Sequence, residues 1–273
     1  MTTNDQDRAP LSSDGKVSLV VPIWREDAAF AGLIGEIAAW PEIREVIVAA
    51  ADTDPAGLKA MQAAGARCFS TEQPGRGGQL NLGARHATGE WLLFHHADTD
   101  LTRAHVQALA ALTPASGIVG GAFYRKFDQR HPSCGWMEPI ERWHNRTFGA
   151  LYGDQSLFTR RSHFETLGGF ADIPLMEDVE FSRRLRASGR IALLDPPIAS
   201  SPRKHLANGA WRTTFQNASI LLLYSLGVNP RRLHSWYYGA RPATFNPTQI
   251  QQHHENQTHI PADGTVAATD APR

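Results

Sequence analysis

Short, wholly apolar runs alternate with helical patterns over the first hundred residues of the chain. Runs long enough for buried strands cover residues 17–23, 45–50, 66–70 and 91–96. Between them, apolar residues recur every three or four positions, as on one face of an amphipathic helix. These helical stretches lie at residues 30–37, 55–64 and 80–87. Strands that are apolar on both faces and alternate with helices predict an α/β fold with a covered parallel sheet.

The second half of the chain has a less regular pattern. We expect a strand near 118–124 and helices near 177–188 and 210–227, with an aromatic and charged segment at 135–152. After Gly239 the composition changes to Pro, Gln, Thr, Asn and His with few apolar residues. Such a composition cannot bury a core, so a largely disordered tail is predicted.

Composition and charge exclude several classes of protein. The chain has 273 residues, of which 42% are hydrophobic and 20% charged, enough for a full core. Its 27 basic and 27 acidic side chains cancel, so no overall charge directs it to nucleic acid. The first sixteen residues lack the pattern of a secretion signal, which predicts a cytoplasmic protein. Cys68 and Cys134 offer neither a disulfide framework nor a zinc spacing.

Two imidazoles and two carboxylates follow the fourth predicted strand in the run HHADTD, residues 95–100. Ligands of parallel sheets bind beyond the carboxyl ends of the strands. Asp98 and Asp100 provide hard oxygen ligands at i and i+2, which suits Mg²⁺ or Mn²⁺ beside phosphates. On spacing alone, solvated turn acids are the commoner explanation. His95 and His96 alternate faces, so one is expected in the core and the other at the site.

Two further motifs could serve an anionic ligand and a proton transfer. PGRGGQLNLG, residues 74–83, brings glycines and Arg76 to a helix start, where backbone amides can hold phosphate, although a plain turn fits equally well. It matches neither a Walker loop nor the dinucleotide fingerprint. LMEDVEFSRRLRASG, residues 175–189, places Glu177 and Asp178 in the first turn of a helix. Acids there commonly offset the helix dipole, or one of them can act as a general base.

Three motifs, in this order, resemble those of family 2 glycosyltransferases with the GT-A fold. VSLVVPIWRED resembles their first strand and acidic turn, and GRGGQLNLGARHATGEWLLFHHADTDL their glycine-rich helix and DXD-type motif. LYGDQSLFTRRSHFETLGGFADIPLMEDVEFSRRLRASGR resembles the acceptor-side block that ends in the ED motif. Within this family the chain looks most similar to the small bacterial "transferase 2" group, found beside radical-SAM or selenium-related genes and linked to arsenosugar biosynthesis.

The resemblance implies a Rossmann-like, mostly parallel central sheet with helices on both faces. It also implies a division of the chain into a flexible start, 1–15, and one glycosyltransferase domain, 16–240. Within that domain a nucleotide-binding half, 16–124, would precede an acceptor half, 125–240. The disordered tail would cover 241–273.

The implied reaction is metal-dependent and inverting, and moves a hexosyl or related glycosyl group from a nucleotide-diphosphate sugar to an acceptor hydroxyl. The acceptor would be a small molecule or lipid-linked, the metal Mg²⁺ or Mn²⁺, and the donor a UDP-sugar by default. By resemblance, Asp178 is the catalytic base and Glu177 orients it. Asp98 is the principal metal ligand, assisted by Asp100. Residues expected at the donor, the acceptor or a closing loop are Pro22, Glu26, Asp52, Arg76, Gln79, Asn81, His96, Asp98, Tyr152, Asp154, Gln155, His205 and Trp211.

The sequence departs from the family pattern at two places. VAAADTD stands where relatives usually carry an acid that accepts a hydrogen bond from the nucleotide base. The alanines cannot do so; Asp52 could substitute if the loop shifts, or Asp54 could match only a later aspartate of the family. His96 stands where many relatives have the first Asp of the metal motif, which lowers the local negative charge.

Two other functions remain open. Nucleotidyltransferases share a related sheet, but they typically carry a glycine-rich loop with a basic residue after the first strand, where this chain has PIWRED. A non-catalytic nucleotide-sugar binding protein would explain the alanines after the second strand.

Peripheral contact with the inner face of a membrane is also considered, through residues 218–238. The apolar run ASILLLYSLGV is too short to cross a bilayer, but arginines and aromatics follow it. A helix packed under the core is the simpler expectation. The sugar, the acceptor and the oligomeric state are not indicated by the sequence.

Overall fold

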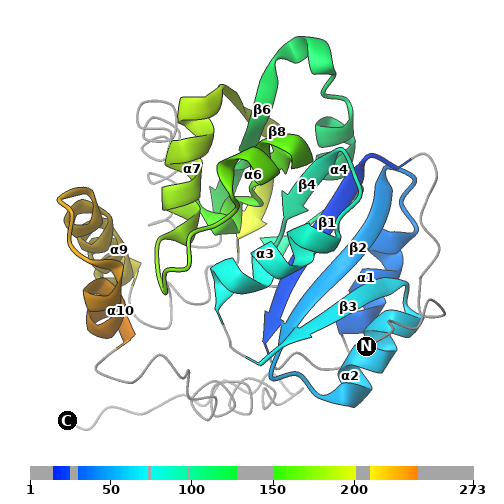
Figure 1. The fold of residues 1–273 in the computed structure, drawn as a ribbon, viewed down its shortest axis with the longest axis horizontal. Coiled ribbons are helices and arrows are strands. Elements are labelled where there is room, and N and C mark those ends of the chain that lie inside the picture. Colours follow the sequence, from blue (N-terminus) through cyan, green and yellow to red (C-terminus); the bar gives the residue numbers. More distant parts are fainter. Residues whose placement is uncertain are drawn as a thin grey trace, which may run out of the picture.

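The computed structural model of the protein describes residues 15–24, 30–72, 75–96, 99–127, 151–200 and 210–238. Within these ranges the chain forms one eight-stranded sheet with helices packed against it (Figure 1). Four of its strand pairs are parallel and three are antiparallel. The α/β fold predicted from the alternating pattern is therefore confirmed.

The first half of the chain alternates strands with helices as predicted. Its strands are β1 (Val17–Trp24), β2 (Ile43–Ala51), β3 (Ala66–Thr71) and β4 (Trp91–Phe94). Its helices are α1 (Phe30–Ala38), α2 (Pro55–Ala63) and α3 (Arg76–His86). β2 and β4 pair with opposite sides of β1, all three in parallel. The winding direction thus reverses between β1 and β4, which is where ligands bind in open α/β sheets.

The second half of the chain extends the sheet with antiparallel and parallel pairs. Its elements are β5 (Thr99–Asp100), α4 (Arg103–Ala110), the 3₁₀ turn η2 (Pro114–Ser116), β6 (Ile118–Phe127), the 3₁₀ turn η3 (Gly153–Gln155), β7 (Phe158–Arg160), α6 (Arg161–Leu167), α7 (Glu177–Ser188), β8 (Arg190–Ser200), α9 (Ala210–Ser225) and α10 (Pro230–Tyr238).

The sheet curls so that its far edge returns toward the candidate site. The strand order is β3-β2-β1-β4-β7-β6-β8-β5. Three strands therefore separate β4 from β5, although β5 begins shortly after β4 ends in the sequence. A short connection can join them only if the edge formed by β8 and β5 bends back to the carboxyl end of β4.

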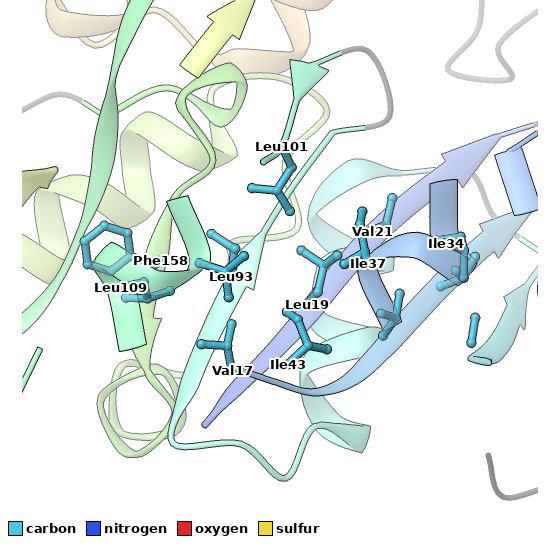
Figure 2. Close-up of a cluster of buried hydrophobic side chains, with 14 of the residues drawn as sticks. Val17, Leu19, Val21, Ile34, Ile37, Ile43, Leu93, Leu101, Leu109 and Phe158 are labelled. Atoms are coloured by element: carbon cyan, nitrogen blue, oxygen red, sulfur yellow. The ribbon is translucent and has the colours of Figure 1, made fainter. Parts of the chain in front are cut away.

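Two apolar clusters enclose the sheet, because its central strands point apolar side chains to both faces. Leu19 and Val21 belong to the cluster that includes side chains of α1 and α4 (Figure 2). Val20 belongs to the cluster shared with α3, α6 and α7. α3 lies so close to β1 that a β-carbon on Gly83 would come within 2.4 Å of Val20 Cγ1. A larger residue there would push α3, and Arg76 at its start, away from the sheet.

The sequence pattern does not predict α4, α6, α10 or β8. β8 contains Pro196 and Pro197, which ordinarily argue against a strand inside a sheet. The sheet accommodates them by an irregular register, in which Phe123 pairs with Leu194 and Arg125 next pairs with Ile198. The prolines therefore lie at a local bulge, where ladder hydrogen bonds are interrupted.

The expected last helix exists, but it is not packed under the core. α9 and α10 contact one another and lie beside the part of the molecule that contains α7 (Figure 1). Ile220 and Leu233 are buried, whereas Phe215, Leu222 and Leu226 are exposed. No helix in the described ranges is both long and apolar enough to cross a bilayer.

Candidate active site

The carboxylate of Asp178 is fixed at the first turn of α7 by two backbone amides. Its Oδ1 accepts a hydrogen bond of 2.7 Å from the N–H of Val179, and its Oδ2 accepts one of 2.7 Å from the N–H of Gly153. Burial raises the pKa of Asp178, and Arg76 and the two amides oppose this shift. A carboxylate held in one orientation, with a proton affinity above that of a solvated Asp, is suited to accept a proton.

Glu177, the neighbouring acid, is buried with 3% of its surface exposed. Its Oε1 lies 3.3 Å from Nη1 of Arg76, and within the described ranges this oxygen has no hydrogen-bond partner. Burial raises the pKa of Glu177 to about 7; the Arg76 charge opposes the shift and the Asp178 charge adds to it. Because the two carboxyl groups are adjacent and partly shielded from water, ionisation of one makes ionisation of the other less favourable.

The starts of α3 and α7 meet at this pair of acids. Gly77 in α3 packs so closely that a β-carbon there would lie 2.9 Å from the carbonyl oxygen of Ala171 and 3.6 Å from the Glu177 side chain. The glycine-rich segment thus forms the first turn of α3 and brings Arg76 beside Glu177. Both helices direct their positive dipole ends, together with the Arg76 guanidinium, toward the same place, which favours an anionic ligand.

His96 and Asp178 both lie close to Gly153. A β-carbon on Gly153 would stand 2.6 Å from His96 Nε2 and 3.4 Å from Asp178 Oδ2. The imidazole nitrogen and the carboxylate oxygen therefore lie close to the position that a β-carbon would take, so residue 153 has to be glycine in this arrangement. His95, by contrast, is buried, and its Nδ1 is hydrogen-bonded to Oγ of Ser156 at 2.7 Å. The prediction that one of the two histidines belongs to the core and the other faces the site agrees with this arrangement.

The turn η3 places Asp154 next to the acids of α7. Asp154 Oδ2 is ion-paired with Arg125 of β6, and Oδ1 is buried without a hydrogen-bond partner within the described ranges. The negative charge of Asp154 contributes to the raised pKa of Asp178. Gln155 is fully buried, and its Oε1 accepts a hydrogen bond of 3.0 Å from the N–H of Tyr152. The Gln155 side chain therefore stabilises the turn η3 itself.

Gln79 and Asn81 of α3 use their amide groups within the protein. Gln79 Nε2 donates hydrogen bonds to the carbonyl oxygens of Ile23, at 2.7 Å, and Ala49, at 2.8 Å. Asn81 Nδ2 donates to the carbonyl oxygen of Phe170 and Oδ1 accepts from the N–H of the same residue, both at 2.8 Å. These bonds fix α3 to β1, β2 and the segment before α7. Their expected contact with a donor stays a prediction.

Pro22 and Asp52 lie at the carboxyl ends of β1 and β2, on the edge of the sheet where α3 begins. Pro22 pairs with Ala49 in the parallel ladder. Ala49, Ala50 and Ala51 are fully buried, so these positions of β2 are closed to a nucleotide base. Asp52 is the first residue beyond β2, is exposed, and has a φ of 50°. Its expected substitution for the missing family acid stays a prediction.

The predicted metal site lies partly outside the described residues, which exclude Asp98. Asp100 is exposed on β5. Thr99 donates two hydrogen bonds to the carbonyl oxygen of His96, from its N–H at 3.2 Å and its hydroxyl at 2.9 Å. These bonds hold the start of β5 against the end of the β4 segment. Among the residues with described positions, no group of three or more His, Cys, Asp or Glu side chains could hold a metal ion.

Other predicted residues also fall outside the description. Glu26 and His205 are not among the described residues, and Trp211 is described only as part of the backbone of α9. Their expected roles at the donor and in a closing loop stay predictions.

Backbone strain marks three positions at the rim of this site. Asp52, Ser156 and Met176 are the residues other than glycine with a positive φ in the described parts of the chain. Ser156 follows η3, and Met176, with φ 69°, directly precedes Glu177. Such strain persists only where surrounding structure enforces it, and it is commonest at functional sites. Neither Met176 nor Arg125 carries a signal in the sequence that would have identified it.

These features define an α/β protein whose carboxylates, helix starts and strained turns gather beyond the carboxyl ends of parallel strands, where such folds bind nucleotides. The model of the glycosyl transferase family 2 domain matches residues 18–161. The chain belongs to this family. A comparison with curated proteins found no match.

Solved structures with the same fold include proteins bound to a nucleotide or a nucleotide sugar. TarS 1-349 of S. aureus, in complex with UDP, matches with a TM-score of 0.56 and 17% identity, over 68% of this chain and 60% of that one. The mannosyltransferase PcManGT of Pyrobaculum calidifontis, in complex with GDP-Man and Mn²⁺, matches with a TM-score of 0.56 and 17% identity, over 95% of this chain and 79% of that one. The fold is therefore GT-A.

Proposed function

We propose that the protein catalyses a metal-dependent, inverting transfer of a sugar from a nucleotide-diphosphate sugar to a hydroxyl group of a small-molecule or lipid-linked acceptor. The observation that carries the proposal is the fixed orientation of Asp178 between the N–H groups of Gly153 and Val179. The neighbouring acid, Glu177, lies beside the Arg76 guanidinium. This arrangement supplies a base and a cationic helix start at one place.

Asp178 acts as the general base of the reaction. The acceptor hydroxyl loses its proton to the Asp178 carboxylate while its oxygen forms a bond to the anomeric carbon. The bond from that carbon to the diphosphate breaks, and the electron pair leaves with the nucleoside diphosphate. Because the acceptor enters opposite the leaving group in a single displacement, the configuration inverts. Glu177 orients the base, and Arg76 with the starts of α3 and α7 stabilises negative charge on the diphosphate.

Asp98, with Asp100 assisting, would hold Mg²⁺ or Mn²⁺. The donor set fits such an ion, because both groups are carboxylates and the described one, Asp100, is exposed on β5, directly after Thr99, which is hydrogen-bonded to His96. When bound, the ion would offset charge developing on the departing diphosphate. His96 lowers the negative charge of this motif relative to an Asp.

The donor half of the proposal places Pro22, Asp52, Gln79 and Asn81 near the nucleotide. A UDP-sugar is the default donor. TarS is bound to UDP and PcManGT to GDP-Man, at the same TM-score, so fold similarity alone does not choose the base. The narrower similarity to the bacterial transferase 2 group, and the division into a donor half (16–124) and an acceptor half (125–240), belong to the same proposal.

A nucleotidyltransferase would use the same metal and phosphate groups, but it would release diphosphate from a nucleoside triphosphate. The positioned base Asp178 favours glycosyl transfer, which requires deprotonation of a hydroxyl. The products distinguish the two: a nucleoside diphosphate for sugar transfer, inorganic diphosphate for the alternative.

The test combines nucleotide binding with turnover. UDP, GDP, ADP, CMP and dTDP are each added with and without Mn²⁺ to the wild type, Asp98→Ala and Asp178→Asn, and the melting temperature is measured. One nucleotide should raise it in a Mn²⁺-dependent way, since a ligand specific for the native state stabilises it. Asp98→Ala should lose this shift.

Release of that nucleotide from its sugar donors is measured in parallel. Asp178→Asn should keep the thermal shift and lose about a hundred- to ten-thousand-fold in turnover, as expected for a missing general base. Substantial turnover in Asp178→Asn would overturn its role. Binding without turnover in the wild type across a broad acceptor panel would favour a non-catalytic binding protein.

A further inference from the structure

The outer face of α9 carries a continuous apolar stripe. Phe215, Leu222 and Leu226 expose 70%, 60% and 72% of their surface. Leu226 directly follows α9 and continues its hydrogen-bond pattern, with its N–H 2.9 Å from the carbonyl oxygen of Leu222. At about 3.6 residues per turn, spacings of seven and four therefore place all three in one line. Trp236 on α10 is 54% exposed. Large apolar side chains that gather in this way mark a contact surface, whereas single ones would be ordinary.

The charged side chains of the same segment are all basic. Residues 210–238 contain three arginines, Arg212, Arg231 and Arg232, and no Asp or Glu, although the whole chain is neutral. Arg231 and Arg232 are exposed at the start of α10. Helices that combine exposed aliphatic and aromatic side chains with arginines, and lack acids, bind at the interface of anionic bilayers.

This pair of helices is attached to the helix that carries the candidate base. Arg183 of α7 donates a hydrogen bond of 3.1 Å to the hydroxyl of Ser225, and its guanidinium lies 5.1 Å from the ring centre of Tyr224. The phenol of Tyr238, at the end of α10, is close enough to Arg76 and Glu177 for their charges to act on it. The apolar stripe therefore belongs to a surface that adjoins the candidate site.

We propose that α9 and α10 dock the protein on the surface of an anionic lipid bilayer. The apolar stripe would enter the boundary between headgroups and acyl chains, and Arg231 and Arg232 would contact lipid phosphates. A second copy of the chain is the competing occupant, but two such faces would bring Arg231 and Arg232 against one another without a matching acid in the segment.

Flotation of the full-length protein with vesicles tests this proposal. Vesicles of phosphatidylcholine alone are compared with vesicles containing phosphatidylglycerol as well, at low and high salt. The wild type should float with the anionic vesicles, and high salt should reduce the floated fraction. Leu222→Glu should lower that fraction at least tenfold. The matched control is Asn217→Glu, which adds the same charge at an exposed position of α9 away from the stripe, and should float like the wild type.

The double variant Arg231→Gln, Arg232→Gln should lose the preference for anionic vesicles. A wild type that stays in the soluble fraction with both vesicles overturns the proposal, as does flotation of Leu222→Glu at the wild-type level. Light scattering tests whether a second copy of the chain covers the stripe instead. A wild-type dimer that becomes a monomer in Leu222→Glu would assign the stripe to self-association. Nucleotide-induced thermal shifts in the same variants keep this result separate from the proposed transferase activity.

Discussion

The backbone N–H of Gly153 donates a hydrogen bond of 2.7 Å to Oδ2 of Asp178, and the ring of His96 lies close to the same glycine. The turn η3 therefore orients the acid at the start of α7, although 25 residues separate the two in the sequence. The absence of a side chain at position 153 keeps the imidazole and the carboxylate close together.

Gly153→Ala is expected to impair turnover more than folding. The added β-carbon would stand 2.6 Å from Nε2 of His96, so the imidazole or the turn must shift, and Asp178 would lose its orientation. We expect a decrease in kcat of tenfold or more, because small displacements of a reacting group have large effects on rate. Steady-state kinetics would measure it, with the nucleotide-induced thermal shift retained.

The matched control is Gly32→Ala in α1, where a β-carbon would meet nothing within 4 Å. It should raise the unfolding free energy by about 0.5–1 kcal/mol and leave kcat unchanged. Equal effects of both substitutions on kcat would show that Gly153 has no special role.

The stability of the protein should fall as pH rises toward neutrality because of Glu177. Its pKa is raised from 4.5 to about 7 in the folded protein, chiefly by burial. The neutral carboxyl is therefore favoured in the fold; its contribution is complete below about pH 4.5 and is lost as pH rises through about 7. Glu177→Gln should remove this dependence, so the gap between the variant and the wild type should widen from pH 5 to 7.5 in urea unfolding. A constant gap would contradict the raised pKa.

Replacing Arg76 should move the pH profile of activity to higher pH. The guanidinium lies 3.3 Å from Glu177 and lowers the pKa of both acids of α7. In Arg76→Met the acids should hold their protons to higher pH, so the rising limb of the activity profile should move to higher pH, and affinity for the nucleotide diphosphate should weaken. Arg85→Met, at an exposed position in the last turn of the same helix, is the control and should alter neither. If the rising limb of the activity profile does not move in Arg76→Met, Arg76 does not control the protonation of Glu177 and Asp178.

Asn81→Ala should destabilise the protein. The side chain satisfies both backbone polar groups of Phe170, with two hydrogen bonds of 2.8 Å. Leaving these groups without partners should cost about 1–3 kcal/mol of unfolding free energy, measured by denaturant titration. If Asn81 also contacts the donor, affinity for the nucleotide should fall in conditions where the variant is fully folded; unchanged affinity would limit it to a structural role.

The sequence predicts the first hundred residues of the fold closely, because the pattern there is local. β1 to β4 and the three helices between them follow the apolar runs and helical stripes within a few residues. β8 was missed because its two prolines argue against a strand, and only pairing with β6 across a bulge makes one possible. The curl that returns β5 to the end of β4 depends on pairings between distant segments, which no local pattern contains.

The site could be predicted only as far as its residues lie in motifs. Glu177 and Asp178 stand out in the sequence as acids at a helix start, and the structure places them beside Arg76. Arg125 was not predicted, because its partner Asp154 lies 29 residues further along and in a different motif. The family resemblance implies that Gln79 and Asn81 lie at the donor, which stays a prediction; in the structure both hold backbone groups of other segments.

The hydrogen bonds of α3 have a consequence for how proteins with this fold can diversify. Through Gln79 the helix is bound to the ends of β1 and β2, and through Asn81 and Arg76 to the segments before and at the start of α7. The spacing between the sheet edge and the base is thereby set by one short helix. Under the proposed function, loops on the acceptor side can change in length and composition without altering that spacing, so new acceptors can be adopted while the reaction itself stays the same.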